Sequence, residues 1–379
     1  MRIIAIQPFL KSPAVDPSPG PSARNAALLS EELMRRGCVV EIFPSPEAIG
    51  TESRWAVAPG TSARVWPTME LPVAGDLRLL LSAVPRLRPL PRSARQMVFA
   101  WMELVAMHRA LAHGMPDIVH DHLGMMRLTS MMRALGARVP VVLTHPEGQV
   151  ETDLAAYAAV AFPSRMAEAR SASKVRNTRI IPPPVNPVFL AGEVATPPFP
   201  GSLLFVGGPH AGGGLELLLQ TLRAEDRLRG TCRVTVCGDV PEAERIRREI
   251  DKEGLPVTMA GMVTTAGLRE ILDQTALLVL PGHPAAGSRA LREAACRGVP
   301  AVTWSGQADD LNEVLDMPAA IGLAVGEREP GALAGHIFSA LEGATASPSF
   351  RAGLARRARD VFSPAGYADR YLRLYGEVS

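Results

Sequence analysis

Glu293 stands in the stretch of this sequence where chemistry is easiest to place. An apolar run, Leu277–Leu280, is followed by a loop of small residues, His283–Ser288, and then by a short helical pattern that contains Glu293 and ends at Gly298. A second apolar run starts at Val299. The order strand, loop, helix, strand predicts a βαβ unit, and ligands of such sheets bind beyond the carboxyl ends of the strands. Because the loop is too poor in large side chains to form core, we expect another molecule to approach it.

Two further stretches combine a strand end with groups that attract anions. Gly207–Gly214 holds five glycines directly after a strand pattern. Its backbone N–H groups can wrap an anion, and the alternative is that the loop merely turns tightly. Near the start of the chain, the loop Pro8–Pro21 leads into a helix that begins near Ser22. Arg24 places a cation at the N-terminus of that helix, where anions are favoured, and the alternative is an ordinary surface arginine.

Three histidines lie at or near the ends of predicted strands. His120 and His122 share one face of an extended segment, and His145 ends the strand pattern that starts at Val139. In principle the three can bind a metal. That requires three or four converging ligands, and no cysteine or carboxylate clearly joins them. We therefore expect no metal site.

Composition bounds the class of protein. The 379 residues are 47% apolar and 21% charged, which is typical of a soluble globular protein with room for two domains. A formal net charge of +2 argues against a dedicated nucleic-acid binder. The four cysteines, Cys38, Cys232, Cys237 and Cys296, are scattered, which predicts reduced thiols and a cytoplasmic location. The N-terminal apolar run is too short for a signal peptide.

Two stretches have some features of membrane-binding segments. Met97–Met107 is apolar but interrupted by Glu103, which favours a buried helix over a helix on a membrane surface. Arg78–Arg92 is basic and rich in leucine, and we favour a solvated, partly packed connection over a lipid contact. No run approaches the roughly 18 apolar residues of a spanning helix. We therefore expect no membrane contact.

Strand and helix patterns alternate along the chain and restart after the proline-rich residues 182–201. Proline removes backbone donors and restricts its neighbour, so this stretch is typical of a linker. The pattern predicts the α/β class, with two doubly wound Rossmann-like domains facing a central cleft. We expect an N-terminal domain over residues 1–183, a linker over 184–201, a second domain over 202–360 and a C-terminal helix over 361–379.

Several stretches carry motifs of a known family. The sequence resembles the retaining, nucleotide-sugar-dependent glycosyltransferases of family four, which have the GT-B fold. The resemblance covers nearly the whole chain and is strongest over residues 203–302. It implies that the final helix, with YADRYLRLY, crosses back onto the first domain. The other segments that carry it are PDIVHDHLG (116–124), VVLTHPE (141–147), IIPPPVNPVF (180–189), LLFVGG (203–208) and LREAACRGVPAV (291–302).

The resemblance also shows which family residues are absent. In the family, an arginine after the glycine turn and a lysine five residues on hold the donor diphosphate, and the matching positions here are Gly208 and Gly213. The family has two glutamates eight residues apart. The one that touches the transferred sugar is replaced by Ala285, and the one that holds the ribose hydroxyls is Glu293. The resemblance thus implies a divergent donor site.

The resemblance implies a role for each matching position. Glu293 holds the ribose, Ser288 and Arg289 take the diphosphate with the glycine loop, and His145 hydrogen-bonds the donor sugar as the catalytic-site histidine. The alternative for His145 is a supporting role behind the site. Preorganised cations are typically worth several kcal/mol toward a leaving diphosphate, so His210, Arg289, Arg24 or backbone amides must replace the missing pair. We place His122 on the acceptor side. The donor-binding set that we expect is Gly20, Arg24, Gly207, Gly208, His210, Gly213, Met262, Gly287, Ser288, Arg289 and Glu293.

The function implied by the resemblance is a glycosyltransferase of the hexosyltransferase kind, which retains the anomeric configuration. Its co-substrate is a nucleotide sugar, with no other cofactor and no catalytic metal. We expect a small-molecule acceptor, such as a natural product of antibiotic biosynthesis, in a pocket shaped by the irregular residues 44–95. Two alternatives stay open. One is a degenerate GT-B protein that binds a ligand or partner without transferring sugar, and the other is an enzyme on this scaffold that uses a different leaving group.

Overall fold

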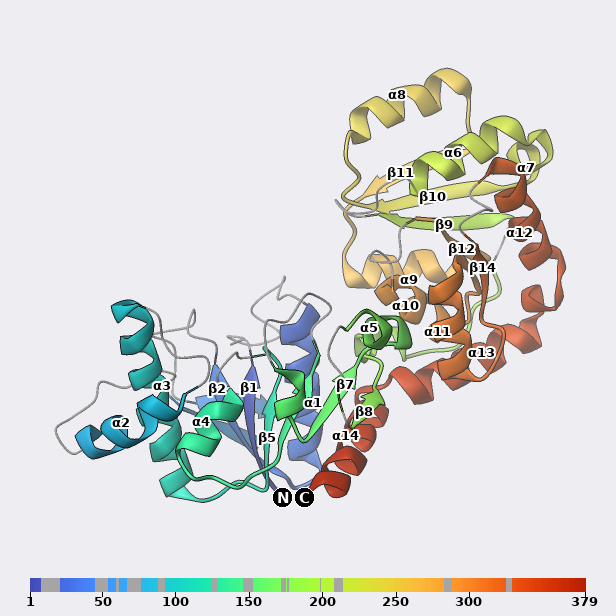
Figure 1. The fold of residues 1–379 in the computed structure, drawn as a ribbon. Helices are drawn as coiled ribbons and strands as arrows, with labels where there is room; N and C mark the ends of the chain where they lie inside the picture. Colours follow the sequence, from blue (N-terminus) through green and yellow to red (C-terminus); the bar gives the residue numbers. More distant parts are fainter. Residues whose placement is uncertain are drawn as a thin grey trace. The chain divides into compact units, whose positions relative to one another are not determined.

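The chain folds into two compact units, each with its own sheet and core (Figure 1). Unit 1 consists of Met1–Pro183 with Pro364–Ser379, and unit 2 consists of Pro184–Ser363. Both are α/β units with helices on both faces of a largely parallel sheet, which confirms the prediction of two doubly wound domains. The computed structural model describes residues 1–7, 21–44, 54–58, 61–66, 76–87, 93–124, 128–145, 153–171, 175, 177–197, 199–207, 214–282, 288–324 and 329–379.

The sheet of unit 1 is built, within the described residues, from β1 (Arg2–Gln7), β2 (Val39–Pro44), β3 (Arg54–Ala58), β4 (Thr61–Val65), β5 (Ile118–Asp121), β6 (Val141–Thr144), β7 (Ala159–Phe162) and β8 (Thr178–Ile180). Their order is β3-β4-β2-β1-β5-β6-β7-β8. All neighbours pair in parallel except β3 and β4, which form an antiparallel edge. The direction of winding reverses between β1 and β5, and ligands of open parallel sheets bind at such a reversal.

Helices cover both faces of this sheet because its strands are apolar on both sides. On β1, Ile3 and Ala5 face a core formed with α1 (Pro21–Arg35) and α14 (Pro364–Val378). Ile4 and Ile6 face the opposite core, formed with α3 (Ala94–His113) and α4 (Leu128–Ala134). Helix α14 packs against α1, so the end of the chain completes unit 1. The other helical segments described in unit 1 are α2 (Leu77–Ala83), η3 (Val84–Arg86), η4 (Leu154–Ala156) and α5 (Arg165–Arg170).

The sheet of unit 2 is fully parallel in the described residues and has the order β11-β10-β9-β12-β13-β14. Its strands are β9 (Ser202–Gly207), β10 (Arg233–Gly238), β11 (Val257–Gly261), β12 (Leu277–Leu280), β13 (Ala301–Trp304) and β14 (Ala320–Leu323). The chain winds outward from β9 to β11 and then outward in the other direction from β12 to β14. The reversal between β9 and β12 is therefore the ligand-binding position of this sheet.

Helices cover both faces of the second sheet as well (Figure 1). One face carries α6 (Gly214–Ala224) and α8 (Ala243–Glu253), and α12 (Pro330–Glu342) packs against α6. The other face carries α9 (Thr265–Asp273), α10 (Ser288–Cys296) and α11 (Ser305–Leu315), and α13 (Pro348–Phe362) packs against α10 and α11. The shorter segments are η5 (Pro187–Phe189), α7 (Asp226–Thr231) and η7 (Ala344–Ala346).

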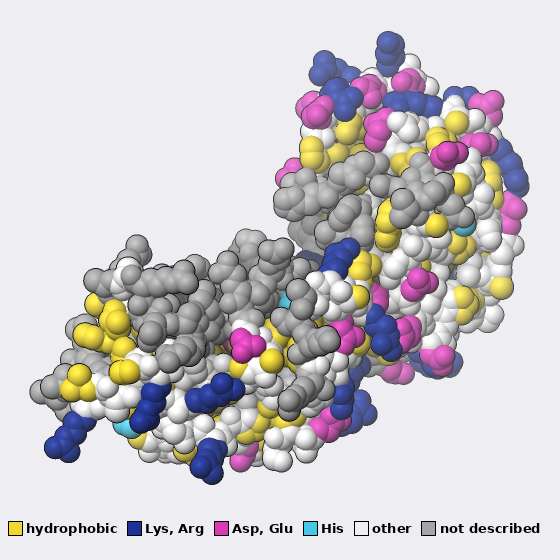
Figure 2. Space-filling view, in the orientation of Figure 1, with side chains coloured by type: hydrophobic (Ala, Val, Ile, Leu, Met, Phe, Trp, Pro, Cys, Tyr) yellow, Lys and Arg dark blue, Asp and Glu magenta, His cyan; other side chains and the backbone are white. Residues whose placement is uncertain are grey.

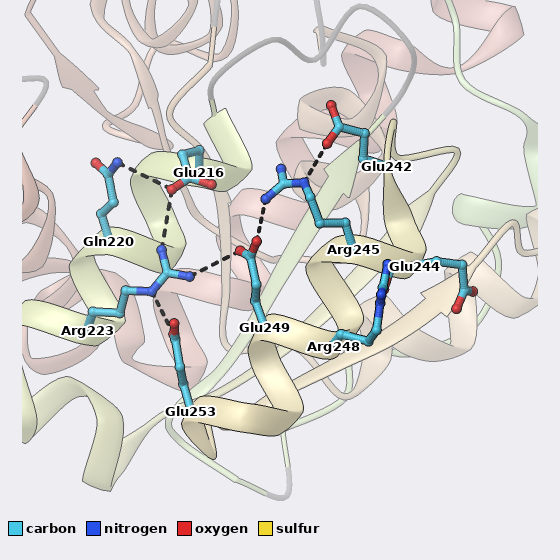
Figure 3. A network of polar contacts seen from close by, with 9 residues as sticks. All are labelled: Glu216, Gln220, Arg223, Glu242, Glu244, Arg245, Arg248, Glu249 and Glu253. Atoms are coloured by element: carbon cyan, nitrogen blue, oxygen red, sulfur yellow. Dashed lines mark hydrogen bonds and ion pairs between the residues drawn. The ribbon is translucent and has the colours of Figure 1, made fainter.

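Exposed ion pairs join α6 to α8 on the surface of unit 2 (Figure 3). Arg223 of α6 contacts Glu216 on its own helix at 3.3 Å, and Glu249 and Glu253 on α8 at 3.5 and 2.7 Å. Arg245 extends the network through Glu249. Exposed pairs of this kind are worth about 0–1 kcal/mol each. The network therefore orients the two helices, while the buried apolar core supplies most of the stability of the unit.

A buried arginine attaches the beginning of unit 2 to its helices. Arg297 follows α10 and is 1% exposed. Its Nε donates to Asp273 Oδ1 at 2.7 Å, and its other nitrogens donate to the carbonyls of Ala191 and Glu193 at 2.6 and 2.7 Å. A buried charge is tolerated only when it is paired and hydrogen-bonded, as here. Arg297 thereby fixes residues 191–193 against α9 and α10.

The elements differ from the sequence prediction in a few places. The predicted strand Leu277–Leu280 coincides with β12. Met97–Met107 lies in α3, as the helix prediction requires, but it is buried on one side only: Leu104 and Val105 are fully buried, whereas Val98 and Trp101 are exposed. Within Arg78–Arg92, however, the described residues up to Arg86 form α2 and η3 rather than an irregular connection. Leucine favours helix, and the surrounding prolines conceal that preference. Helices α4 and α7 are too short to give a helical period in the sequence.

Candidate functional site

The winding reversal of unit 2 brings two strand ends and two helix starts together. Strands β9 and β12 lie side by side, and the next described helices along the chain are α6 and α10. A Cβ built on Gly214, the first residue of α6, would lie 2.9 Å from the backbone of Gly282. The chain therefore requires glycine where α6 starts against the end of β12. Both helices direct unpaired N–H groups and the positive end of their dipole toward this edge of the sheet.

Glu293 lies on α10 at this position and is 2% exposed. Arg289, one turn earlier, donates from Nε to Glu293 Oε1 at 2.7 Å. The arginine side chain is 46% exposed, whereas that of the glutamate is 3% exposed. A buried carboxylate is thus covered by a cation that solvent reaches. The neighbouring Cys296 is not a nucleophile, because burial raises the pKa of its thiol to about 12.

Other residues of the expected donor set have varied positions. Gly207 ends β9, where an added Cβ would lie 3.0–3.1 Å from the side chains of Phe205 and Val240. Met262 follows β11 and is 77% exposed, and Ser288 starts α10. Strands β9, β11 and β12 are parallel members of one sheet, so all three positions lie at its carboxyl edge. The structure does not describe Gly20, Gly208, His210, Gly213, Ala285 and Gly287.

His122 lies at the corresponding reversal of unit 1. It follows β5, and its N–H donates to the carbonyl of Ile6 on β1 at 2.8 Å. Arg24 lies in the first turn of α1, the helix after β1, and is partly buried. Both residues therefore belong to the elements that form this reversal. The side chain of His122 is nevertheless buried, because the residue as a whole is 4% exposed.

A buried hydrogen-bond chain fixes the histidines of β5. His120 forms a hydrogen bond through one ring nitrogen to the hydroxyl of Tyr375 at 2.6 Å and through the other to the hydroxyl of Thr144 at 2.8 Å. Thr144 is also hydrogen-bonded to Tyr371 at 2.5 Å. The ring of His120 lies 3.8 Å from that of His122, centroid to centroid. Burial lowers the pKa of His122 to about 3. For His120, burial is the larger cause and the neighbouring His122 a smaller one, and together they hold its pKa well below 6.5. Both imidazoles are neutral near pH 7.

His145 faces the other side of the sheet from His120 and His122. It follows β6, and its ring stacks on Phe162 at 4.7 Å, in the core shared with α3 and α4. Its predecessor Thr144 points the opposite way, toward α14. The three histidines therefore do not converge, contrary to the arrangement that a shared metal would need. Among the described residues, no group of three or more His, Cys, Asp or Glu side chains is placed to hold a metal ion.

Sequence reasoning missed several residues that build this part of unit 1. Asp121 is fully buried and accepts hydrogen bonds from the N–H groups of Leu123 and Gly124, each at 2.9 Å, and from the hydroxyl of Tyr157 at 2.8 Å. It shapes the turn after β5. The tyrosines of α14 were also missed, although their spacing of four places them on one helix face. That spacing was the signal available in the sequence.

Comparison with known proteins defines the class of this fold. Residues 200–342, which lie in unit 2, match the family model described as "Glycosyl transferases group 1". The whole chain is similar in structure to sucrose-phosphate synthase from Thermosynechococcus elongatus, with a TM-score of 0.64, 18% identity, and coverage of 100% of this chain and 99% of that chain. The chain therefore has the fold of the GT-B glycosyltransferases. No curated protein matches the sequence.

Two further solved structures share the fold. AviGT4, a glycosyltransferase involved in avilamycin A biosynthesis, has a TM-score of 0.58 and 19% identity, with 100% of this chain and 97% of that chain covered. HepE of Anabaena, solved in complex with UDP-glucose, has a TM-score of 0.58 and 15% identity, with both chains covered completely. At these identities the likeness establishes the fold. The activity has to be argued from the residues of this chain.

Proposed function

We propose that this protein is a retaining glycosyltransferase that moves a sugar from a nucleotide sugar to a small-molecule acceptor. The observation that carries the proposal is the buried Glu293 on α10, at the winding reversal of a sheet whose residues 200–342 match a glycosyltransferase model. Ligands of open parallel sheets bind at such a reversal. A carboxylate there accepts hydrogen bonds from two ribose hydroxyls.

The proposed donor contacts follow from the same edge of the sheet. Glu293 holds the ribose, and the N-termini of α6 and α10 direct N–H groups at the diphosphate. Arg289 supplies a cation, since its exposed guanidinium can turn from Glu293 to the phosphates. By the family resemblance, His145 contacts the sugar and His122 belongs to the acceptor side. Arg289 would thus partly replace the two cationic side chains of the family, whose positions here are occupied by Gly208 and Gly213.

The proposed acceptor is a small natural product of the kind used in antibiotic biosynthesis. The support is the shared fold of AviGT4 and a sequence that departs from the family pattern in its donor site. We place the enzyme in the cytoplasm, because its four cysteines are free thiols. The nucleotide sugar is its co-substrate, and we propose no other cofactor and no catalytic metal.

A second candidate is a GT-B protein that binds a nucleotide or partner without transferring sugar, or that uses another leaving group. The observation that favours it is the replacement of both diphosphate-binding cations and of the sugar-contacting glutamate by Gly208, Gly213 and Ala285. A developing diphosphate charge needs preorganised cations or dipoles. An enzyme with an uncharged leaving group does not.

Thermal unfolding in the presence of nucleoside diphosphates tests the proposal. A nucleotide that binds unit 2 raises the melting temperature. Glu293→Gln should weaken its binding about 10–100-fold, the effect of losing charged hydrogen bonds to the ribose. Glu270→Gln, at an exposed position of α9, is the matched control and should change nothing. If no common nucleoside diphosphate stabilises the protein, the donor-site assignment is wrong.

The role of Arg289 is tested separately. Arg289→Met should weaken diphosphate binding about tenfold and leave binding of the unphosphorylated nucleoside unchanged. Equal losses for both ligands would show that the arginine only holds Glu293 in place. Hydrolysis of a nucleotide sugar that is seen with the unaltered protein distinguishes an enzyme from the degenerate alternative, which would bind nucleotides without cleaving them.

A further inference from the structure

Helices α2 and α3 of unit 1 carry large apolar side chains on their exposed faces. Leu81 on α2 is 69% exposed, and Val98 and Trp101 on α3 are 49% and 37% exposed. The two helices pack against each other. Figure 2 shows yellow and dark-blue side chains over α2 and α3, at the left of the view. We call these three residues, with the exposed Arg78 and Arg86, the α2–α3 surface.

This surface is basic as well as apolar. The segment from Leu77 to Val98 contains no aspartate or glutamate, and its arginines Arg78 and Arg86 are exposed on the described helices. Of the acids that flank it, Asp76 is paired with Arg109 at 3.1 Å and has a 12% exposed side chain. Glu103 is partly buried. The two described acids that flank this segment in the sequence are thus paired or partly buried, while Arg78 and Arg86 are exposed.

Residues of both kinds are exposed on these helical segments. On α2 and η3, Arg78, Leu81 and Arg86 are exposed, whereas Ala83 is buried. On α3, Val98 and Trp101 are three residues apart, and the inward face of that helix is closed by Leu104 and other core residues. The exposed apolar groups are therefore additional to those that the core of unit 1 requires.

We propose that the α2–α3 surface binds an anionic lipid surface. Apolar side chains enter the boundary between headgroups and acyl chains, and arginines at the same level pair with lipid phosphates. A nucleic acid would satisfy the arginines but leave Leu81, Val98 and Trp101 in water. The inference goes beyond the proposed function and does not depend on it. None of the described helices is long and apolar enough to cross a membrane, so the contact would be peripheral.

Co-sedimentation of the full chain with vesicles tests this assignment. We expect binding to vesicles of phosphatidylcholine mixed with phosphatidylglycerol and little binding to phosphatidylcholine alone. Leu81→Glu should weaken binding about tenfold or more. Arg78→Ala and Arg86→Ala should each weaken it about fivefold, and added salt should reduce these differences. A blue shift of tryptophan emission on binding should disappear in Trp101→Phe.

Met115→Glu is the matched control. Met115 is 59% exposed in unit 1 but lies outside α2 and α3, so this variant should bind as the unaltered protein does. The proposal is overturned if neither type of vesicle sediments the protein, if Leu81→Glu binds as well as Met115→Glu, or if RNA binds while vesicles do not. A concentration-dependent dimer that Leu81→Glu abolishes would assign the surface to a second copy of the chain instead.

Discussion

We expect the burial of two neutral imidazoles at the end of β5 to make the folding of unit 1 sensitive to acid. His120 has a hydroxyl partner at each ring nitrogen, and its ring lies against the tilted ring of His122. A protonated imidazole requires two hydrogen-bond acceptors and solvation of its charge, and meeting both requirements in a buried core costs free energy. The arrangement therefore stabilises the folded chain only while both rings stay neutral.

The stability of unit 1 should fall as the pH falls from about 6.5 toward 3. In the unfolded chain these histidines take up protons near their ordinary pKa of 6.5, whereas in the folded chain the pKa of His122 is about 3. The unfolded state binds more protons between these values, so His122 alone lowers the free energy of unfolding by about 1.4 kcal/mol per pH unit. Above pH 6.5 the imidazole of His122 is neutral in both the folded and the unfolded chain, so its protonation no longer lowers the free energy of unfolding.

Urea unfolding at several pH values checks this. His122→Gln should flatten the dependence between pH 6 and 4, although it also changes the packing against His120. His108→Gln, at an exposed position of α3, should leave the slope as it is in the unaltered chain. Parallel slopes in all three proteins would show that the buried histidines do not couple folding to pH.

At the scale of elements, single buried contacts decide how segments distant in the sequence are joined. Arg297 connects residues 191–193 to α9 and α10 through Asp273 and two carbonyl groups. Tyr371 and Tyr375 similarly join α14 to β5 and β6. The exposed network of α6 and α8 has more ion pairs (Figure 3) but is solvated and screened. We therefore expect the buried contacts to contribute more to the stability of these units than the exposed ion pairs do.

Arg297→Met should destabilise unit 2 by about 3–5 kcal/mol, because it leaves Asp273 without its buried partner and two carbonyl groups unsatisfied. Arg247→Met is the control, since Arg247 pairs with Glu244 at a position where both side chains are largely exposed. It should change the free energy of unfolding by about 0.5 kcal/mol or less. Chemical unfolding of both variants measures the difference, and equal values would contradict the assigned role of the buried arginine.

At the scale of the whole molecule, the two units are built differently from the chain. Unit 2 is one continuous segment, Pro184–Ser363, whereas unit 1 needs Pro364–Ser379 to cover one face of its sheet. Tyr367, Tyr371 and Tyr375 are fully or almost fully buried there. Each unit has its own buried core, so independent folding is physically reasonable when its segments are complete.

Residues 184–363 expressed alone should fold cooperatively and, if the proposed donor site is right, keep nucleotide binding. Residues 1–183 alone should be strongly destabilised, because the surface under α14 becomes exposed, and fusing residues 364–379 through a flexible linker should restore the unfolding transition. Circular dichroism and calorimetry on the three polypeptides measure this. A stable fold of residues 1–183 without the helix would show that α14 is dispensable for unit 1.

The sequence by itself determined the alternation of strands and helices, the two doubly wound units and the place of Glu293. These features follow from local periodicity and from glycine and proline at element ends, which act over a few residues. The sequence did not predict helix α2, because it is short and prolines in the surrounding stretch obscure its helical pattern. The expected residues Gly208, His210 and Gly213 lie outside the described part of the chain, and their donor contacts stay predictions.

Only the tertiary structure decided which groups meet across long sequence distances. His120 is 255 residues from Tyr375 and Arg297 is 106 residues from Ala191, and no local pattern encodes either pairing. The opposite orientations of His122 and His145 likewise depend on the pleat of two different strands. A side chain's partner, burial and pKa are set by how whole elements pack together, and that packing depends on contacts between residues far apart in the sequence.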